Sequence, residues 1–302
     1  MGAQPLVSVC IPCYNGAAFI ARTLESVLNQ ELTDATQVVI CDNRSTDDTL
    51  SVIAGFADPR LKLVQNDQNL GIASNWQKAL SLVRGKYIKL LCADDLIYPD
   101  CLARQVAALE APEHAAAALA VCSSDIINAS DEILFRRTCR FRSGLNRGAD
   151  VIRKCVRGGT NLIGEPMAGL FRRSALDRAG LFESQNPFLI DMELWACLLK
   201  QGDMYVDQAC LSAFRISGQS LSADIGLKQA AAFRLFARSM QQDPFYQITD
   251  LDRRLGGILS MQWCLLRNSF TWLQSCRDRA FRTRRSTPCP PAGRPSKALL
   301  CS

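Results

Sequence analysis

The stretch YIKLLCADD, residues 87–95, decides the fold class of this 302-residue chain. Its apolar run predicts a buried strand from Tyr87 to Cys92 that leads directly into the adjacent carboxylates of Asp94 and Asp95. Open α/β sheets bind their ligands where the strands end. The pair is therefore a candidate cation site, because two unpaired charges beside a buried strand are costly. An ordinary helix N-cap is the alternative, and the pair alone does not decide between them.

The segments around this stretch alternate short apolar runs with runs of helical period, which is typical of a mostly parallel sheet with crossover helices. Strands are expected at residues 6–11, 37–41, 61–64, 87–92, 115–122, 132–135, 165–171 and 209–215. Helices are expected at residues 19–28, 70–83, 188–199, 227–240 and 251–276, and after a cap at residues 45–48. Pro12 is expected to end the first strand, and residues 136–159, which show no clear period, to form a loop. The fold class expected is α/β, with a mostly parallel central sheet flanked by helices and a C-terminal helical extension.

Length and composition favour one domain over residues 1–225, a helical extension over residues 226–276 and a basic, Pro-rich tail over residues 277–302. The tail holds seven basic residues and one acidic residue; subtracting them from the 35 basic and 29 acidic residues of the chain leaves 28 of each. The net charge of +6 therefore belongs to the tail. A disordered end and a contact with anionic lipid both fit that composition, and neither requires nucleic acid.

The fourteen cysteines lie scattered in apolar runs, so they are interpreted as small core residues of a protein from a reducing compartment. Cys10 and Cys13 form a C-x-x-C pair, but with no second pair and a single histidine, His114, a zinc site is not expected. The first residues do not resemble a signal peptide, which predicts a cytoplasmic protein. Residues 255–276 predict an amphipathic helix, either packed on the core or lying on the inner face of a membrane.

Six short motifs together resemble a known family. They are residues 7–15 (VSVCIPCYN), 42–49 (DNRSTDDT), 69–75 (NLGIASN), 93–95 (ADD), 190–195 (IDMELW) and 214–222 (FRISGQSLS). In order and spacing they resemble the family 2 glycosyltransferases, whose fold is of the GT-A type. The resemblance covers residues 5–223, and six matches in the right order are far more specific than any one of them.

The resemblance implies a role for each matched residue. Asp95 corresponds to the ligand of a divalent metal, Mn2+ or Mg2+, and Asp94 to its companion on the ribose or diphosphate. Asp191 corresponds to the general base that takes the proton of the acceptor hydroxyl, with Glu193 as a second candidate. The other donor-binding positions that the resemblance implies are Pro12, Tyr14, Asn15, Asp42, Asn43 and Asn75.

The implied reaction is a metal-assisted, inverting transfer of a sugar from a nucleoside-diphosphate donor to a hydroxyl of a lipid-linked or cell-surface glycan. The implied partners are the nucleotide sugar and a glycan or glycolipid acceptor, with peripheral membrane contact through the C-terminal helix and tail as a further option. Two positions depart from the family pattern. Ser217 stands where many relatives have a metal-binding histidine, and Ser74 stands where many have an arginine.

Two other classes of function stay open. A nucleotidyltransferase also needs carboxylates, a metal and an α/β sheet, but it predicts a Gly-rich basic loop after the first strand, where this chain has Pro12–Gly16. A catalytically impaired nucleotide-binding partner protein is favoured by Ser217. No motif in the sequence specifies the donor sugar, the base or the acceptor.

Overall fold

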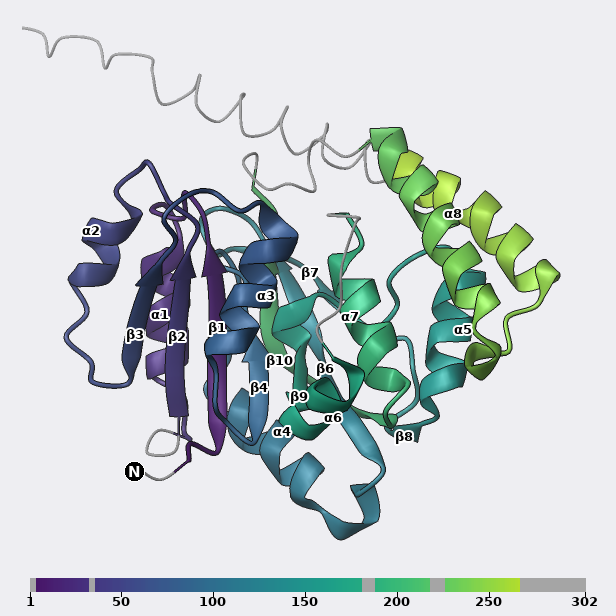
Figure 1. The fold of residues 1–302 in the computed structure, drawn as a ribbon, viewed down its shortest axis with the longest axis horizontal. Coiled ribbons are helices and arrows are strands. Elements are labelled where there is room, and N and C mark those ends of the chain that lie inside the picture. The colour runs from purple at the N-terminus through teal and green to yellow at the C-terminus, as the bar shows by residue number, and fades with distance from the viewer. Residues whose placement is uncertain (1–3, 33–35, 181–187, 218–225, 267–302) are drawn as a thin grey trace, which may run out of the picture.

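The computed structural model describes residues 4–32, 36–180, 188–217 and 226–266, and within them ten strands form one sheet (Figure 1). The strands are β1 (Val7–Cys13), β2 (Thr36–Asp42), β3 (Leu61–Gln65), β4 (Tyr87–Leu90), β5 (Leu96–Ile97), β6 (Ala117–Ile127), β7 (Ile133–Arg137), β8 (Gly144–Asn146), β9 (Gly169–Arg172) and β10 (Asp203–Arg215). Their order across the sheet is β3-β2-β1-β4-β9-β6-β10-β5, with β7 beside β6 and β8 beside β10.

The strands that lead into the site run in one direction. Cys10 of β1 lies in parallel register with Val39 of β2 and Leu90 of β4, and β6 is parallel to β10. β9 is antiparallel to both β4 and β6, so β4 and β6 point the same way. The carboxyl ends of β1, β2, β4, β6 and β10 therefore meet at one edge of the sheet, where α/β folds place their ligands.

Helices cover both faces of the sheet (Figure 1). They are α1 (Ile20–Leu28), α2 (Thr49–Ala54), α3 (Ile72–Leu82), α4 (Cys101–Glu110), α5 (Gly148–Gly158), α6 (Arg173–Ala179), α7 (Ile190–Leu199) and α8 (Gly226–Gln242), with short 3-10 turns η1 (Pro112–His114), η2 (Pro166–Ala168) and η4 (Pro244–Tyr246) and a final helical stretch at residues 250–266. Alternate residues of β1 face opposite ways, so Val9 belongs to the buried cluster that includes residues of α1, α2 and α4, whereas Cys10 belongs to the cluster that includes residues of α3, α5, α6 and α7. This arrangement confirms the α/β class expected from the sequence.

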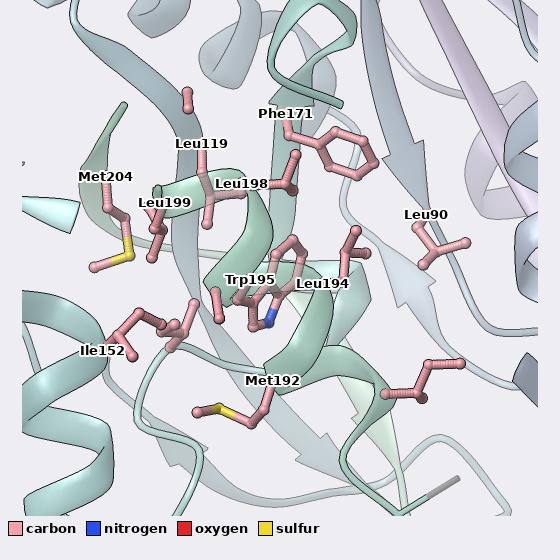
Figure 2. Close-up of a cluster of buried hydrophobic side chains, with 14 of the residues drawn as sticks. Leu90, Leu119, Ile152, Phe171, Met192, Leu194, Trp195, Leu198, Leu199 and Met204 are labelled. Atoms are coloured by element: carbon pink, nitrogen blue, oxygen red, sulfur yellow. The ribbon is translucent and has the colours of Figure 1, made fainter. Parts of the chain in front are cut away.

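The buried indole of Trp195 fixes α7 against the sheet. Figure 2 shows it at the centre of a cluster of buried side chains that come from helices and strands. Its Nε1 donates a hydrogen bond of 2.9 Å to the carbonyl of Gly164, and its ring meets the edge of Phe171. A Cβ at Gly169 would lie 2.6 Å from Trp195 Cη2, so this position of β9 has no room for a side chain. The first turn of α7, which carries Asp191, is thereby held at a defined place.

Two local expectations from the sequence are wrong. Pro12 does not end the first strand, since β1 continues to Cys13. β4 pairs with β1 only as far as Cys10, so the N–H that Pro12 lacks would have had no partner strand there. Residues 136–159 are not a loop, because β8 and α5 lie within them. The buried apolar positions of α5, such as Val151 and Cys155, do follow a helical period, so the sequence carries a signal for this helix.

The described residues end at residue 266, so the expected tail at residues 277–302 and the last part of the helix expected at residues 251–276 lie outside them. Of the helices in the described part of the chain, none is both long and apolar enough to cross a membrane. The cysteines described in the structure are all free thiols, and those at 10, 13, 41, 101, 122, 155 and 264 are buried.

Candidate functional site

Four carboxylates converge at the sheet edge, and we call Asp94, Asp95, Glu165 and Asp191 the acidic cluster. Asp94 and Asp95 follow β4, Glu165 precedes η2 and β9, and Asp191 lies in the first turn of α7. Burial raises the pKa of Asp95 well above its ordinary value, and the charges of Asp94 and Glu165 raise it further. Burial likewise raises the pKa of Asp94. Burial and mutual repulsion thus disfavour the ionised form of Asp95, although the charge of Arg215 partly offsets this.

Asp95 has the features of a cation ligand. Its side chain is fully buried, and its Oδ1 accepts a hydrogen bond of 3.0 Å from the backbone N–H of Arg215. Its Oδ2 is buried and has no hydrogen-bond partner. An unsatisfied carboxylate oxygen among other acids fits a hard divalent ion such as Mn2+ or Mg2+. The described residues contain no group of three or more His, Cys, Asp or Glu side chains arranged around a metal position, so oxygens from outside the protein would have to complete the shell.

Arg215, a residue that the sequence reasoning did not assign to the site, holds the acidic pair in place. Its guanidinium is fully buried, where Nε donates to the carbonyl of Asp94 at 2.7 Å and Nη1 donates to the carbonyl of Asn128 at 2.9 Å. Nη1 also pairs with Asp131 at 2.5 Å, and the guanidinium lies 4.6 Å from the ring centroid of Phe19. Strand β10 therefore fixes both the main chain of Asp94 and the carboxylate of Asp95. Ser217 follows two residues later, at the end of the described segment.

Asp191 is oriented by two donors. Its Oδ1 accepts from the backbone N–H of Met192 at 2.8 Å, and its Oδ2 accepts from Nδ2 of Asn161 at 2.7 Å. Burial raises the pKa of Asp191 to about 6 and the charge of Glu165 adds to the rise, whereas both hydrogen bonds lower it. Asp191 is therefore ionised at neutral pH but remains a stronger base than an ordinary aspartate.

Asn161 and Glu165 were missed by the sequence reasoning, although both lie against named residues. Asn161 closes a tight turn by accepting from the N–H of Ile163 and Gly164, and this turn aims its amide at Asp191. Glu165 is paired with Arg137 through both of its oxygens. Neither residue belongs to a repeated motif, so the only sequence signal was the short run of turn residues before Pro166.

The loops after β1 and β2 are tied to each other. Asn15, in a left-handed conformation with φ of 50°, accepts at Oδ1 from the N–H of Thr46 at 2.8 Å. The N–H of Gly16 donates to Thr49 Oγ1 at 2.8 Å, and Asp42 accepts from both the N–H and the hydroxyl of Ser45. Tyr14, which projects from this joined pair of loops, is 49% exposed. The N-cap residue of α2 is Asp48, within the expected residues 45–48, but its side chain makes no capping hydrogen bond; Asp47 accepts from the N–H of Thr49 at 3.1 Å.

Below these loops lies a set of asparagines, Asn43, Asn66, Asn69 and Asn75, that we call the amide network. Nδ2 of Asn66 donates to Oδ1 of both Asn43 and Asn75 at 2.9 Å. Asn43 in turn donates to Oδ1 of Asn69 at 2.9 Å and accepts from the N–H of Leu70. Asn75 donates to the carbonyl of Cys41 at 3.2 Å. The network thus joins the end of β2 to the start of α3. The side-chain amides of both Asn43 and Asn75 form hydrogen bonds within it.

The structure therefore separates the residues expected to form the site into two groups. Asp94, Asp95 and Asp191 belong to the acidic cluster, whereas Tyr14, Asn15, Asp42, Asn43 and Asn75 surround the joined loops and the amide network. Pro12 is buried in β1. Glu193, which follows Met192 in α7, is half-buried. Both groups lie at the carboxyl edge of the parallel strands, as the sequence predicts for a ligand site.

Residues 8–180 of the chain match the family model described as glycosyl transferase family 2. The chain belongs to this family. The family expected from the sequence is therefore confirmed. The matched range covers the motifs up to Asp94 and Asp95 but ends before the two at residues 190–195 and 214–222, so it does not include Asp191.

Relatives of this family 2 protein share parts of its sequence. An uncharacterized protein of Mycobacterium tuberculosis is 35% identical over 203 residues, which are 65% of this chain and 63% of the relative. The chondroitin synthase of Escherichia coli is 45% identical over 100 residues, which are 32% of this chain and 14% of the synthase. The chain thus spans less than two thirds of the length of either relative.

Solved glycosyltransferase structures share its fold. A mannosyltransferase from Pyrobaculum calidifontis, in complex with GDP-Man and Mn2+, superposes with a TM-score of 0.61 at 20% identity and covers 94% of this chain and 80% of its own. TarS of S. aureus, in complex with UDP-GlcNAc, gives a TM-score of 0.61 at 18% identity and covers 86% of this chain and 72% of its own. These matches confirm the GT-A type of fold for the family 2 chain.

Proposed function

We infer that this family 2 chain is an inverting glycosyltransferase that moves a sugar from a nucleoside-diphosphate donor to a hydroxyl of a lipid-linked or cell-surface glycan. The observation that carries the proposal is Asp191, which is fixed by Asn161 and the N–H of Met192 and has a pKa raised to about 6 by burial. It shares the sheet edge with Asp94 and Asp95. A general base and a cation site placed together are what a single displacement at an anomeric carbon requires.

In the proposed reaction Asp191 accepts the proton of the acceptor hydroxyl while that oxygen forms a bond to the anomeric carbon. The bond from the anomeric carbon to the diphosphate oxygen breaks on the opposite face, so the configuration inverts. The departing nucleoside diphosphate carries off the electron pair of that bond. Asn161 keeps the accepting carboxylate oriented, because its amide holds Oδ2 at 2.7 Å. Glu193 is retained as the second candidate for the base.

A divalent ion, when bound, would neutralise charge that develops on the leaving diphosphate. Asp95 would hold it through its unsatisfied Oδ2, and Asp94 would contact the diphosphate or ribose. Arg215 keeps both residues in position through its backbone N–H and Nε. The absence of a histidine at position 217 leaves this work to the carboxylates and to oxygens of the donor.

The nucleotide is proposed to lie over the joined loops. Tyr14, exposed at their tip, would pack against the base, and Pro12, Asn15, Asp42 and Asn43 would frame the ribose and base. Asn75 would support this wall from beneath through Asn66. Solved relatives in fold carry GDP-Man in one case and UDP-GlcNAc in another, so the identity of the base is left to experiment.

The names of the relatives suggest the class of acceptor. They include a chondroitin synthase of Escherichia coli and a succinoglycan biosynthesis protein, ExoO, of Rhizobium meliloti. Polymeric glycans are therefore the proposed acceptors. Residues 1–225 would form the transferase domain and residues 226–276 its helical extension, and the protein would act in the cytoplasm at the inner face of the membrane.

Donor hydrolysis or transfer, measured with and without a chelator, tests the proposal. The expected results are loss of activity on metal removal and in both Asp95→Asn and Asp191→Asn. Asp177→Asn is the matched control, since that aspartate is 59% exposed on α6, away from the acidic cluster. Full activity in Asp95→Asn and Asp191→Asn would exclude the proposed mechanism.

A nucleotide-binding partner protein without catalysis is a second candidate, because no group of three metal-binding side chains occurs in the described residues. Titration calorimetry separates the two. Nucleotide affinity that is unchanged by Mn2+, together with no turnover, would favour the partner protein over the enzyme.

A further inference from the structure

The final helical stretch, residues 250–266, buries small and polar side chains and exposes large apolar ones. The side chains that it buries are spaced four apart and are small or polar, namely Asp252, Gly256, Ser260 and Cys264. The side chains on its opposite side include Leu251, Ile258 and Leu265, which are 59%, 62% and 56% exposed. These three are spaced seven apart and so share one stripe. An ordinary surface helix turns its apolar side to the core, whereas this one turns it outward.

This helix cannot rotate about its own axis, because its backbone is in close contact with the backbone of α5. A Cβ at Gly256 would lie 1.8 Å from the carbonyl oxygen of Val156, and one at Gly159 would lie 2.5 Å from the N–H nitrogen of Ser260. Trp263 Nε1 donates to the carbonyl of Gly158 at 3.0 Å. Asp252, which is buried, accepts from Arg153 Nε at 2.8 Å. The leucine and isoleucine stripe is therefore held outward by the fold itself.

Helix α8 extends the same surface. Leu235 of α8 is exposed, and the side chain of Arg234 lies against Gly257 of the final helix. Figure 1 shows the two helices together at the edge of the molecule, on the far side of α5 from the sheet. We call Leu235, Leu251, Ile258 and Leu265 with the cations Arg234, Arg238 and Arg254 the C-terminal face; these side chains are all exposed.

The C-terminal face is positively charged. The described residues of the two helices contain only two acids, and both are neutralised, since Asp250 pairs with Arg253 and Asp252 pairs with Arg153 and Arg157. Lys228, Arg234, Arg238 and Arg254 are exposed cations. A second copy of the chain would bring cations against cations across such a face. A surface of anionic headgroups over an apolar layer complements both of its features.

We propose that the C-terminal face docks onto a lipid bilayer that contains anionic lipids. Leu235, Leu251, Ile258 and Leu265 enter the boundary between headgroups and acyl chains, and the arginines contact the headgroups. Two weak signals, apolar area and positive charge, together give stable peripheral binding where either alone does not. The docking surface does not rest on catalysis, since every residue in it lies outside the acidic cluster and the amide network.

Co-sedimentation of the full chain with vesicles tests the proposal. We expect binding to vesicles of phosphatidylcholine and phosphatidylglycerol that is weakened by salt, and much weaker binding to phosphatidylcholine alone. Ile258→Gln should reduce the partition coefficient roughly tenfold, because about one side chain of buried apolar surface is lost. Arg254→Gln should reduce it about fivefold. Ile133→Gln is the matched control, since Ile133 of β7 is 58% exposed and lies outside the face.

Three results would overturn the proposal. One is equal vesicle binding by Ile258→Gln and Ile133→Gln. Another is no binding of the full chain to anionic vesicles, which is also the result expected if residues 267–302 cover the face. The third is a dimer in sedimentation velocity that Ile258→Gln dissociates, which would assign the face to a second copy. Donor hydrolysis without vesicles should be the same in Ile258→Gln and the wild type, so failure here and failure of the proposed transferase are distinguishable.

Discussion

In the amide network the polar side chains satisfy one another, whereas in the acidic cluster they oppose one another. Asn66 supplies both protons of its amide to Asn43 and Asn75, and these two have further partners of their own. Asp95, by contrast, has a buried oxygen without a donor, and its pKa is raised by burial and by neighbouring acids. The side chains of the network therefore satisfy one another, whereas Oδ2 of Asp95 is buried without a hydrogen-bond partner, as the proposed cation site requires.

The largest effect that this comparison predicts is on catalysis in the cluster. Asp191→Asn should lower kcat by about 10²–10⁴-fold, because the variant cannot accept the proton of the acceptor hydroxyl. KM for the donor should change little, since the proposed role of Asp191 is on the acceptor hydroxyl. Steady-state kinetics would measure both constants. A kcat within about threefold of the wild type would exclude Asp191 as the base and leave Glu193 as the candidate.

The second prediction concerns stability in the network. Asn66→Ala should lower the free energy of unfolding by about 2–4 kcal/mol, because the oxygen of Asn75 loses its donor in a buried site. Asn29→Ala, at an exposed position after α1, is the control and should cost less than about 1 kcal/mol. Denaturant titration would measure the difference. Equal effects in the two variants would mean that the network does not stabilise the fold.

The third prediction is a pH dependence of the cluster in the absence of metal. A carboxyl whose folded pKa is raised stabilises the folded protein below its unfolded pKa and loses this contribution as the pH rises through the folded pKa. For Asp191 that window runs from about 4, the ordinary value, to about 6. The stability of the wild type relative to Asp191→Asn should therefore fall across this window by about 2 kcal/mol. A constant difference between pH 4 and 6 would contradict the raised pKa.

The smallest predicted effect concerns Asn161. Its hydrogen bond to Oδ2 lowers the pKa of Asp191, so Asn161→Ala should shift the acidic limb of the pH profile of kcat to higher pH. The shift should be a fraction of a pH unit, up to about one. Asn161→Asp would place a further charge beside Asp191 and should shift the limb in the same direction by more. An unmoved profile in both variants would give Asn161 a purely structural role in its turn.

The sequence predicts the parallel half of the sheet well, because strands such as β1 and β4 are buried on both faces and read as short, mainly apolar runs. It predicts the family through motifs that the fold gathers at one edge. It misses Arg215 as a support of Asp94, and Glu165 beside Asp191, because these contacts join segments far apart in the chain. It also misses α5, although the buried positions of this helix follow a helical period.

The central claim is that the acidic cluster is completed by a cation at Asp95. Thermal unfolding of the wild type and Asp95→Asn, each with a nucleoside diphosphate and with or without Mn2+, tests it most directly. We predict that Mn2+ raises the Tm of the wild type by several degrees, whereas it leaves Asp95→Asn unchanged. Asp177→Asn should respond to Mn2+ as the wild type does. An equal rise in Tm for Asp95→Asn and the wild type would contradict the claim.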